Sequence, residues 1–292
     1  MKFDNRYNSA LLKLELLSRG IRPSPEAQEV IGKQYKEPLR QRAGVGSSGI
    51  DMVLADEIYV GVPTEELFCA GTPFTLEMVE GEFAIAKNGR LIQKVVLFPR
   101  PRYYDRLTRS GIPMQRIGTV QGDFVGIATD NRCWFWGMYE AEDMREYRGK
   151  QCRFCSIGLN LKSTEQPRKD LQDILEVVGE ALKEKHCRHV ALNAGTYPPP
   201  GRGHEEYAEI VRAIKERYNV YVRLSIAPPE EEKYLDILLD SGADLIGYDY
   251  EVYDPDLYRE ICPGKYQEID RGVPHAHYDR IMRHGVAKGG RN

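Results

Sequence analysis

Three cysteines have the type and spacing that suit a metal centre. Cys152 and Cys155 form a C-x-x-C pair, and 18 residues separate Cys133 from Cys152. Cysteine thiolates are the usual ligands of iron–sulfur clusters, and three of them suit a [4Fe-4S] cluster with one iron open to another molecule. A structural zinc site would need a fourth ligand, and a redox or inert pair is the remaining alternative. We expect no fourth ligand from the cysteines in other predicted elements, which are Cys69, Cys187 and Cys262.

The second part of the chain must position these cysteines. Apolar β-type runs at 123–129, 189–194, 220–226 and 244–250 alternate with helical patterns. This alternation predicts βα units and a parallel sheet, in which the chemistry lies beyond the C-terminal ends of the strands. Cys133 lies just past the first predicted strand, so the three cysteines can meet in one loop.

The first part of the chain has a different pattern of predicted helices and strands. Residues 6–19 have a helix-compatible leucine pattern, and a second short helix is predicted from Pro25 to about Tyr35. Short β-like runs follow, and two of them flank Asn88-Gly89, a strong hairpin signal. We expect a small α+β domain over residues 1–118 and a larger α/β domain over residues 119–292.

The composition is that of an ordinary cytoplasmic enzyme. The 292 residues are 41% hydrophobic and carry a formal net charge of -3, so there is no electrostatic reason to propose nucleic acid as a partner. The sequence has no apolar run of about 18 residues or more, and its N-terminus lacks the pattern of a signal peptide. We expect a soluble cytoplasmic protein that binds neither nucleic acid nor a membrane.

Several motifs together resemble a known family. They are Cys-x-aromatic-Cys with Phe154, followed by the run CRFCSIGLNL, then PPGRGHEEY, GYDYEVYDPDLYREICPGK and the upstream FPRPRYYD. Over approximately residues 95–275 the chain is similar to an uncharacterised radical S-adenosylmethionine (radical SAM) family found in bacterial nitrilase gene clusters. That family is related to the biotin and lipoyl synthase branch. The common spacing of the signature is C-x3-C-x2-C, whereas the first gap here is 18 residues, as in the lengthened gap of that family.

The resemblance implies a partial (β/α) barrel of the radical SAM type after the small N-terminal domain. Such a barrel has six βα units, and the sequence shows only four before it ends. We therefore expect a chain that is shortened at its C-terminus and has an open sheet edge. Self-association or a second subunit would cover that edge, because an uncovered strand edge readily pairs with another chain.

The resemblance also implies a cluster site and its chemistry. Cys133, Cys152 and Cys155 would hold a [4Fe-4S] cluster, and the backbone at Phe154 would approach the adenine of S-adenosylmethionine. A reduced cluster would cleave S-adenosylmethionine to a 5'-deoxyadenosyl radical that abstracts hydrogen from a small-molecule substrate. The electron would come from a donor such as ferredoxin or flavodoxin. The alternatives are a non-catalytic zinc or cluster-binding module, or an inactive remnant that acts through a partner.

Residues near the strand ends are expected to hold S-adenosylmethionine. The run NAGT, which contains Gly195 and Thr196, takes the place of the motif that contacts the methionine amino group. Arg223 and Ser225 share one face of their strand and could reach the methionine carboxylate or the substrate, although Arg223 could equally form an ion pair. Glu251 could accept hydrogen bonds from the ribose hydroxyls, or be a solvated carboxylate.

Three further patterns carry less weight. The run from Gly44 to Gly49 matches the dinucleotide fingerprint, but no strand precedes it and no helix follows it. His275 and His277 have no partner carboxylate at a useful spacing, which favours a surface pair over a metal site. The aromatic residues after Cys133 could form a small loop core or a hydrophobic wall around the cluster; they are Trp134, Phe135, Trp136 and Tyr139.

Overall fold

The computed structural model describes residues 7–34, 49–64, 66–139, 149–155, 157 and 167–289. Within them the chain divides into two units, and the boundary lies between Pro101 and Arg102. The sequence predicts this boundary after residue 118. It lies earlier because Tyr103, Met114 and Ile117 are buried in the core of the second unit.

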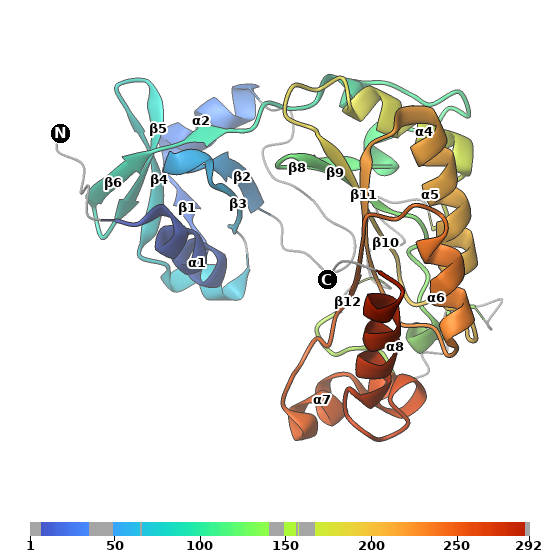
Figure 1. The fold of residues 1–292 in the computed structure, drawn as a ribbon. Helices are drawn as coiled ribbons and strands as arrows, with labels where there is room; N and C mark the ends of the chain where they lie inside the picture. Colours follow the sequence, from blue (N-terminus) through green and yellow to red (C-terminus); the bar gives the residue numbers. More distant parts are fainter. Residues whose placement is uncertain are drawn as a thin grey trace. The chain divides into compact units, whose positions relative to one another are not determined.

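In its described part, the first unit combines two helices with two small sheets (Figure 1). One sheet has the order β1-β4-β5-β6 and the other has the order β3-β2-β7. The helices α1 (Ser9–Arg19) and α2 (Pro25–Gln34) confirm the two predicted helices. The strands are β1 (Arg22–Pro23), β2 (Gly49–Val53), β3 (Tyr59–Pro63), β4 (Phe74–Val79), β5 (Glu82–Lys87), β6 (Arg90–Lys94) and β7 (Val96–Leu97).

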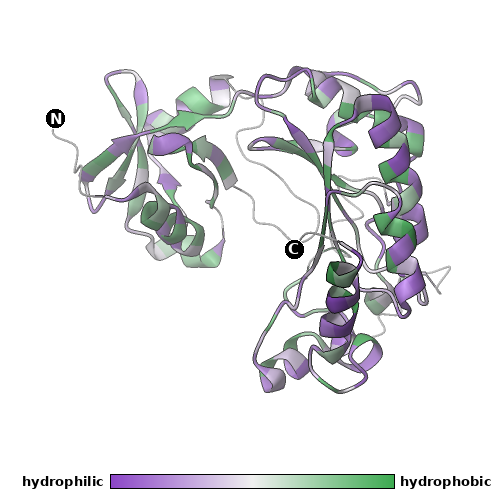
Figure 2. Cartoon of the chain, viewed as in Figure 1, coloured by the Kyte–Doolittle hydropathy of each residue, from purple (hydrophilic) through white to green (hydrophobic). Residues whose placement is uncertain are grey.

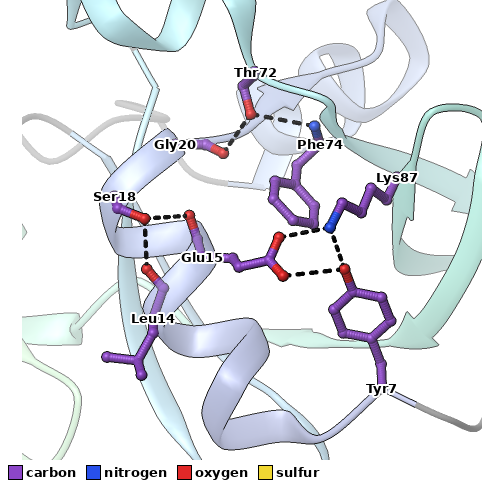
Figure 3. Close-up of polar contacts among 8 residues, drawn as sticks. All are labelled: Tyr7, Leu14, Glu15, Ser18, Gly20, Thr72, Phe74 and Lys87. Carbon is purple, nitrogen blue, oxygen red and sulfur yellow. Dashed lines mark hydrogen bonds and ion pairs between the residues drawn. The ribbon is translucent and has the colours of Figure 1, made fainter.

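The Asn88-Gly89 hairpin is confirmed, since these two residues connect β5 to β6 with positive φ angles of 50° and 75°. A polar network then ties α1 to the sheet (Figure 3). Lys87 Nζ lies 2.7 Å from Glu15 Oε2, and this interaction lowers the pKa of Glu15. Together with the burial of Leu12 and Leu16 against the strands, it fixes the helix on the sheet.

The second unit contains one five-stranded sheet in the order β12-β11-β10-β9-β8. Four neighbouring strands are parallel and confirm the four predicted runs, and β8 pairs antiparallel with β9. The strands are β8 (Thr119–Gln121), β9 (Phe124–Ala128), β10 (His189–Asn193), β11 (Tyr221–Ile226) and β12 (Leu245–Tyr248).

Amphipathic helices connect the parallel strands and lie along one face of the sheet (Figure 1). Alternate strand residues such as Val190, Val222 and Leu224 are buried against apolar residues of these helices, for example Val178 and Val211. Figure 2 shows both polar and apolar residues on each of α4, α5 and α6. The helices are α4 (Leu171–Ala181), α5 (His204–Tyr218), α6 (Glu232–Leu239), α7 (Pro255–Ile261) and α8 (Ala276–Ala287), with a π-helical turn η6 (Lys265–Ile269) between the last two.

The sheet is open in the part of the chain that the structure describes. β12 forms one edge and pairs only with β11, and β8 forms the other edge. The mixed α/β architecture is thus confirmed, whereas the described residues form no closed barrel and the partial barrel remains a prediction. No described helix is both long enough and apolar enough to cross a membrane.

Candidate active site

Cys133 is positioned by the loop that follows β9. Asp130 is fully buried and pairs with Arg132, whose Nη2 lies 2.6 Å from its carboxylate. The loop after β10 packs directly on this segment. The amide of Gly195 donates to the carbonyl of Asp130 at 2.9 Å, and the amide of Trp134 donates to the carbonyl of Thr196 at 2.7 Å. Cys133 is therefore held where the C-terminal ends of β9 and β10 meet.

Gly195 is required by this close approach. A Cβ atom at this position would lie 2.1 Å from the carbonyl oxygen of Arg132 and 2.9 Å from Cβ of Cys133. Such distances are far shorter than any van der Waals contact. The sequence predicts close backbone approach at Gly195, and the structure shows that the partner is the backbone beside Cys133.

The Cys133 thiol is buried but well supplied with donors. Burial raises its pKa, and backbone N–H groups of Thr196, Phe135 and Trp136 oppose that rise by hydrogen bonding to the sulfur. Hydrogen bonds from N–H groups favour the thiolate over the thiol. This environment fits a cysteine that serves as an anionic ligand.

Cys152 and Cys155 form a tight turn near Cys133. The amide of Cys155 donates to the carbonyl of Cys152 at 3.0 Å. Burial raises the pKa of Cys155 to about 11, and hydrogen bonds from the Ile157 amide and the Trp136 side chain oppose this rise. Electrostatic repulsion from Cys152 raises the pKa of Cys133, and repulsion from Cys133 and Cys152 raises the pKa of Cys155, so these side chains lie in one neighbourhood. Among the described residues, no group of three His, Cys, Asp or Glu side chains is close enough together to hold a metal ion.

A fourth cysteine lies in this neighbourhood. Cys262 follows α7 and is completely buried, and its thiol is hydrogen-bonded to the thiol of Cys152. This bond raises the pKa of Cys152 and lowers the pKa of Cys262. The sequence placed Cys262 in a separate element, and only the folded chain brings that element beside the C-x-x-C turn. By contrast, Cys187 lies before β10, away from the strand ends, and Cys69 lies in the first unit.

Two cationic side chains lie close to the thiols. Lys265 forms an ion pair with Glu251, and its charge acts to lower the pKa of both Cys152 and Cys262. Arg202 interacts electrostatically with Cys133 and has a side chain that is only 1% exposed. Charged side chains are normally exposed, so the sequence does not predict that Lys265 and Arg202 lie buried beside the cysteines.

Arg202 is incompletely paired within the described residues. Its Nη2 lies 3.6 Å from a carboxylate oxygen of Glu230, whereas its Nε and Nη1 atoms are buried without a hydrogen-bond partner there. The guanidinium also lies 5.9 Å from the centre of the Phe135 ring. Burial lowers the pKa of Arg202. Its positive charge near Cys133 favours the accumulation of negative charge on thiolate ligands.

The aromatic residues after Cys133 form part of the site's wall. Phe135 and Trp136 are buried in the same apolar cluster as Cys133, and Trp134 and Cys155 pack against that cluster. The indole of Trp134 donates to Glu268 at 2.5 Å. Of the two predictions for this run, the packing favours a hydrophobic wall around the cysteines, although residues 140–148 of the same gap lie outside the described residues.

Of the other predicted cofactor residues, some lie near the end of β12 and one lies near the start of β9. Glu251 lies beside the thiols through its pair with Lys265, and it has a positive φ of 65° just after β12. The Ser225 hydroxyl donates to Asp249, also just beyond β12. Arg223 is not brought to the thiols, because its guanidinium stacks 4.3 Å from the centre of the Phe124 ring at the start of β9.

Phe154 is the most exposed of the predicted site residues in the C-x-x-C turn. Its side chain is 46% exposed, whereas the flanking cysteines are partly buried. The contact between the Phe154 backbone and adenine stays a prediction.

The weaker sequence patterns do not extend the site. His275 Nε2 contacts the carbonyl of Tyr253, while His277 Nε2 contacts the carbonyl of Pro229 at 2.6 Å. The two imidazoles thus contact different backbone groups. The predicted surface pair is wrong for His275, which is buried and whose Nδ1 has no hydrogen-bond partner among the described residues. The glycine-rich run from Gly44 lies outside the described residues up to Gly49, which begins β2.

Comparison with known proteins identifies the type of domain. Residues 149–277 match the Radical SAM superfamily. This part of the chain is similar to a radical SAM domain. The match includes Cys152 and Cys155 and all the predicted cofactor-binding residues, whereas Cys133 lies before it. Members of that superfamily use a [4Fe-4S] cluster and S-adenosylmethionine.

A curated relative agrees with this assignment. Bacteriochlorophyllide c C-7(1)-hydroxylase from Chlorobaculum limnaeum is 25% identical over 135 residues, which make up 40% of this chain. The matched region covers 34% of the relative, or about a third of its length. The finer resemblance to the nitrilase-cluster family and to biotin and lipoyl synthases remains a prediction.

The donor set of this site fits a [4Fe-4S] cluster. Thiolates are the usual protein ligands of such clusters, and hydrogen bonds to their sulfurs and the surrounding charge tune the cluster. Here Cys133 and Cys155 receive N–H donors, Arg202 lies near Cys133, and Lys265 lies near Cys152. Each of these features favours the anionic ligand form.

Proposed function

We propose that Cys133, Cys152 and Cys155 hold a [4Fe-4S] cluster that cleaves S-adenosylmethionine for radical chemistry on a small molecule. The observation that supports the proposal is the proximity of Cys133 to Cys152 and Cys155, since Cys133 lies beyond the C-terminal end of β9, the edge where parallel sheets place their chemistry. When bound, the cluster and S-adenosylmethionine supply a 5'-deoxyadenosyl radical that abstracts hydrogen from a substrate.

The chain's own residues would orient the cofactor and exclude water. The loops containing Gly195 and Thr196 and the strand-end residues Ser225 and Glu251 border the same edge of the sheet. We propose that they bind S-adenosylmethionine with the backbone at Phe154. Phe135 and Trp136 would keep water from the thiols, which reduces competing reactions of a radical.

Arg223 has weaker support as a cofactor ligand. Its stacking on Phe124 places it near the start of β9 instead of near the cysteines. We therefore propose that Arg223 contacts the substrate and not S-adenosylmethionine. A second function class, a zinc-binding module, would use the same thiols, and the nearby Cys262 offers it a fourth ligand.

The decisive experiment is anaerobic reconstitution followed by reduction. We expect about four irons per chain and formation of 5'-deoxyadenosine from S-adenosylmethionine. Separate Cys133→Ala, Cys152→Ala and Cys155→Ala variants should lose the cluster, whereas Cys187→Ala, which alters a buried cysteine outside the site, should retain it. Stoichiometric zinc with no cleavage of S-adenosylmethionine would contradict the proposal in favour of the zinc module.

Partners follow from the same chemistry. We propose a ferredoxin or flavodoxin as the one-electron donor and a small molecule as the substrate. The relative's name describes a hydroxylase, and replacing hydrogen on carbon requires that a C–H bond be broken. Reduction of the reconstituted cluster by ferredoxin or flavodoxin, followed optically under anaerobic conditions, tests the first of these proposals.

The open edge of β12 is the basis of the predicted association. β12 pairs only with β11 among the described strands, and we propose that a second copy or a second subunit covers this edge. Sedimentation velocity should then show a dimer or larger species for the purified chain, or for the chain with its partner. A monodisperse monomer under all these conditions would argue against the association.

A further inference from the structure

No described helix of the second unit lies over one face of β9, β10 and β11 (Figure 1). Alternate residues of these strands are buried beneath the helices on the other face, and the residues between them are partly or fully exposed. Successive side chains of a strand point to opposite faces, so the exposed set shares the uncovered face. This open face consists of Phe124, Gly126, His189, Ala191 and Arg223, together with the residues at the ends of the same strands.

Arg223 lies within the open face and is held by stacking. Its guanidinium carbon lies 4.3 Å from the centre of the Phe124 ring, and that ring lies 5.3 Å from the imidazole of His189. A guanidinium that stacks on an aromatic ring is oriented by it, and the N–H groups at its edge can still pair with a planar anion. The strand and the ring thus fix the direction of the Arg223 side chain.

No described carboxylate balances the charge of Arg223. It forms no ion pair with a described Asp or Glu, and its Nε atom is buried without a hydrogen-bond partner among the described residues. Asp123 lies instead 3.8 Å from Nδ1 of His189. Burial lowers the pKa of His189, Asp123 opposes this shift and Arg223 adds to it, so the imidazole is neutral at pH 7. A partly buried cation without a partner favours the binding of an anion.

Small residues leave room between Arg223 and the end of the sheet that carries the thiols. Arg223 is in register with Ala191 of β10. Ser225, in register with Gly247 of β12, lies two residues or about 7 Å farther toward the strand ends. A Cβ atom at Gly247 would contact only the carbonyl oxygen of Leu224, at 3.4 Å. A small molecule held at Arg223 can therefore extend over this part of the face toward the strand ends.

We propose that Arg223 determines specificity for a substrate that carries a carboxylate, which it binds on the open face through its guanidinium N–H groups. The inference rests on the proposed function, because it names the substrate class of that site. Arginine and carboxylate form bidentate pairs that fix orientation as well as adding affinity. The carbon that loses hydrogen would then lie several bonds away from the carboxylate, because the strand ends are about 7 Å farther along the sheet.

Isothermal titration calorimetry with benzoate tests this assignment, and benzamide serves as an uncharged probe of the same shape. We expect benzoate to bind about tenfold more tightly than benzamide, because a hydrogen bond to a charged group contributes more than one to a neutral group. Arg223→Gln should weaken benzoate binding by about tenfold, and Arg223→Lys, which keeps the charge without the planar fork, should lie between the two proteins.

Arg217→Gln is the matched control. Arg217 also lies over an aromatic ring, that of Tyr218 at 5.5 Å, but it belongs to α5 and not to the sheet. This variant should bind benzoate as the unaltered protein does. Loss of benzoate binding in both variants would show that the effect of Arg223→Gln is not specific to the open face.

Nuclear magnetic resonance of the His189 imidazole locates the bound benzoate. The positive charge of Arg223 contributes to the lowered pKa of His189. Benzoate that pairs with Arg223 should therefore raise this pKa and shift the ring resonances of His189, which a His189→Gln variant identifies by their loss. Arg223→Gln should abolish the effect of benzoate on these resonances.

Several results would overturn the inference. They are equal binding of benzoate and benzamide, unchanged benzoate binding in Arg223→Gln, bound benzoate without an effect on His189, and no binding of benzoate by the unaltered protein. If Arg223→Gln does not fold, as judged by circular dichroism, Arg223→Lys and the comparison with benzamide decide the question. Failure of the proposed function is distinct, since the unaltered protein would then lack iron or leave S-adenosylmethionine uncleaved whether or not it binds benzoate.

Discussion

The ammonium group of Lys265 is ion-paired with the carboxylate of Glu251, and this pair lies beside the thiols of Cys152 and Cys262. Glu251 follows β12, while Lys265 begins the π-helical turn η6. The Lys265 side chain is only 11% exposed. The pair thus connects the end of the last described strand to the segment that carries Cys262.

Replacing one partner of this pair should destabilise the fold. In Lys265→Met the carboxylate of Glu251 loses its cation in a largely buried place, and we expect a loss of about 2 kcal/mol in the free energy of unfolding. Lys265→Met/Glu251→Gln should recover part of that loss because no unpaired charge remains. Urea unfolding of the iron-free proteins measures both values, and equal stability of the two variants would contradict the pairing.

Gly195→Ala should disturb the cluster site directly. The added methyl group would lie 2.1 Å from the Arg132 carbonyl oxygen, so the loop that carries Cys133 must move. Forcing an extra carbon into a packed position typically costs about 1–3 kcal/mol. We expect a loss of that size in urea unfolding together with lower iron content after reconstitution.

Gly32→Ala is the matched control for this change. Gly32 lies within α2, and no atom lies within 4 Å of the Cβ that would be added there. Alanine is favoured over glycine in helices by about 1 kcal/mol, so this variant should be as stable as the unaltered protein or more stable. Equal effects of Gly195→Ala and Gly32→Ala on iron content would show that the approach at Gly195 is unimportant for the site.

The sequence predicts the strands of the second unit well because their signals are local. Runs of apolar residues alternate with amphipathic helices, and the β9–β12 strands lie within the predicted runs. The close approach at Gly195 could also be predicted, since glycine marks positions without room for a side chain. Both signals need only neighbouring residues.

Features that depend on contacts between distant segments could not be predicted in this way. The proximity of Cys262 to Cys152 requires the two backbone hydrogen bonds between 150–153 and 261–264, and no local pattern encodes them. The burial of Arg202 likewise depends on how the loop after β10 packs on Phe135. The domain boundary was misplaced for the same reason, because Tyr103 is buried by residues that come much later in the chain.

His204 and Tyr248 join the start of α5 to β12 through a fully buried hydrogen bond. The imidazole Nδ1 lies 2.7 Å from the carbonyl oxygen of Gly201, which can only accept, so Nδ1 carries the proton. Burial lowers the pKa of His204 to about 4, so the ring is neutral near pH 7. Nε2 then carries no proton and accepts a hydrogen bond from the Tyr248 hydroxyl, which lies 2.8 Å away.

The lowered pKa of His204 should make the folded chain less stable in acid. Its pKa is about 4 in the folded chain and about 6.5 when unfolded, so its contribution is fully present above pH 6.5 and decreases as the pH falls toward 4. The loss should reach about 3 kcal/mol, since each pKa unit corresponds to about 1.4 kcal/mol. In urea unfolding between pH 8 and 4, His204→Asn should lack this part of the pH dependence. Tyr248→Phe should be less stable at every pH but keep the same pH dependence, because His204 is still present and still titrates. If the free energy of unfolding of His204→Asn falls with pH as steeply as that of the unaltered protein, other groups cause the acid sensitivity.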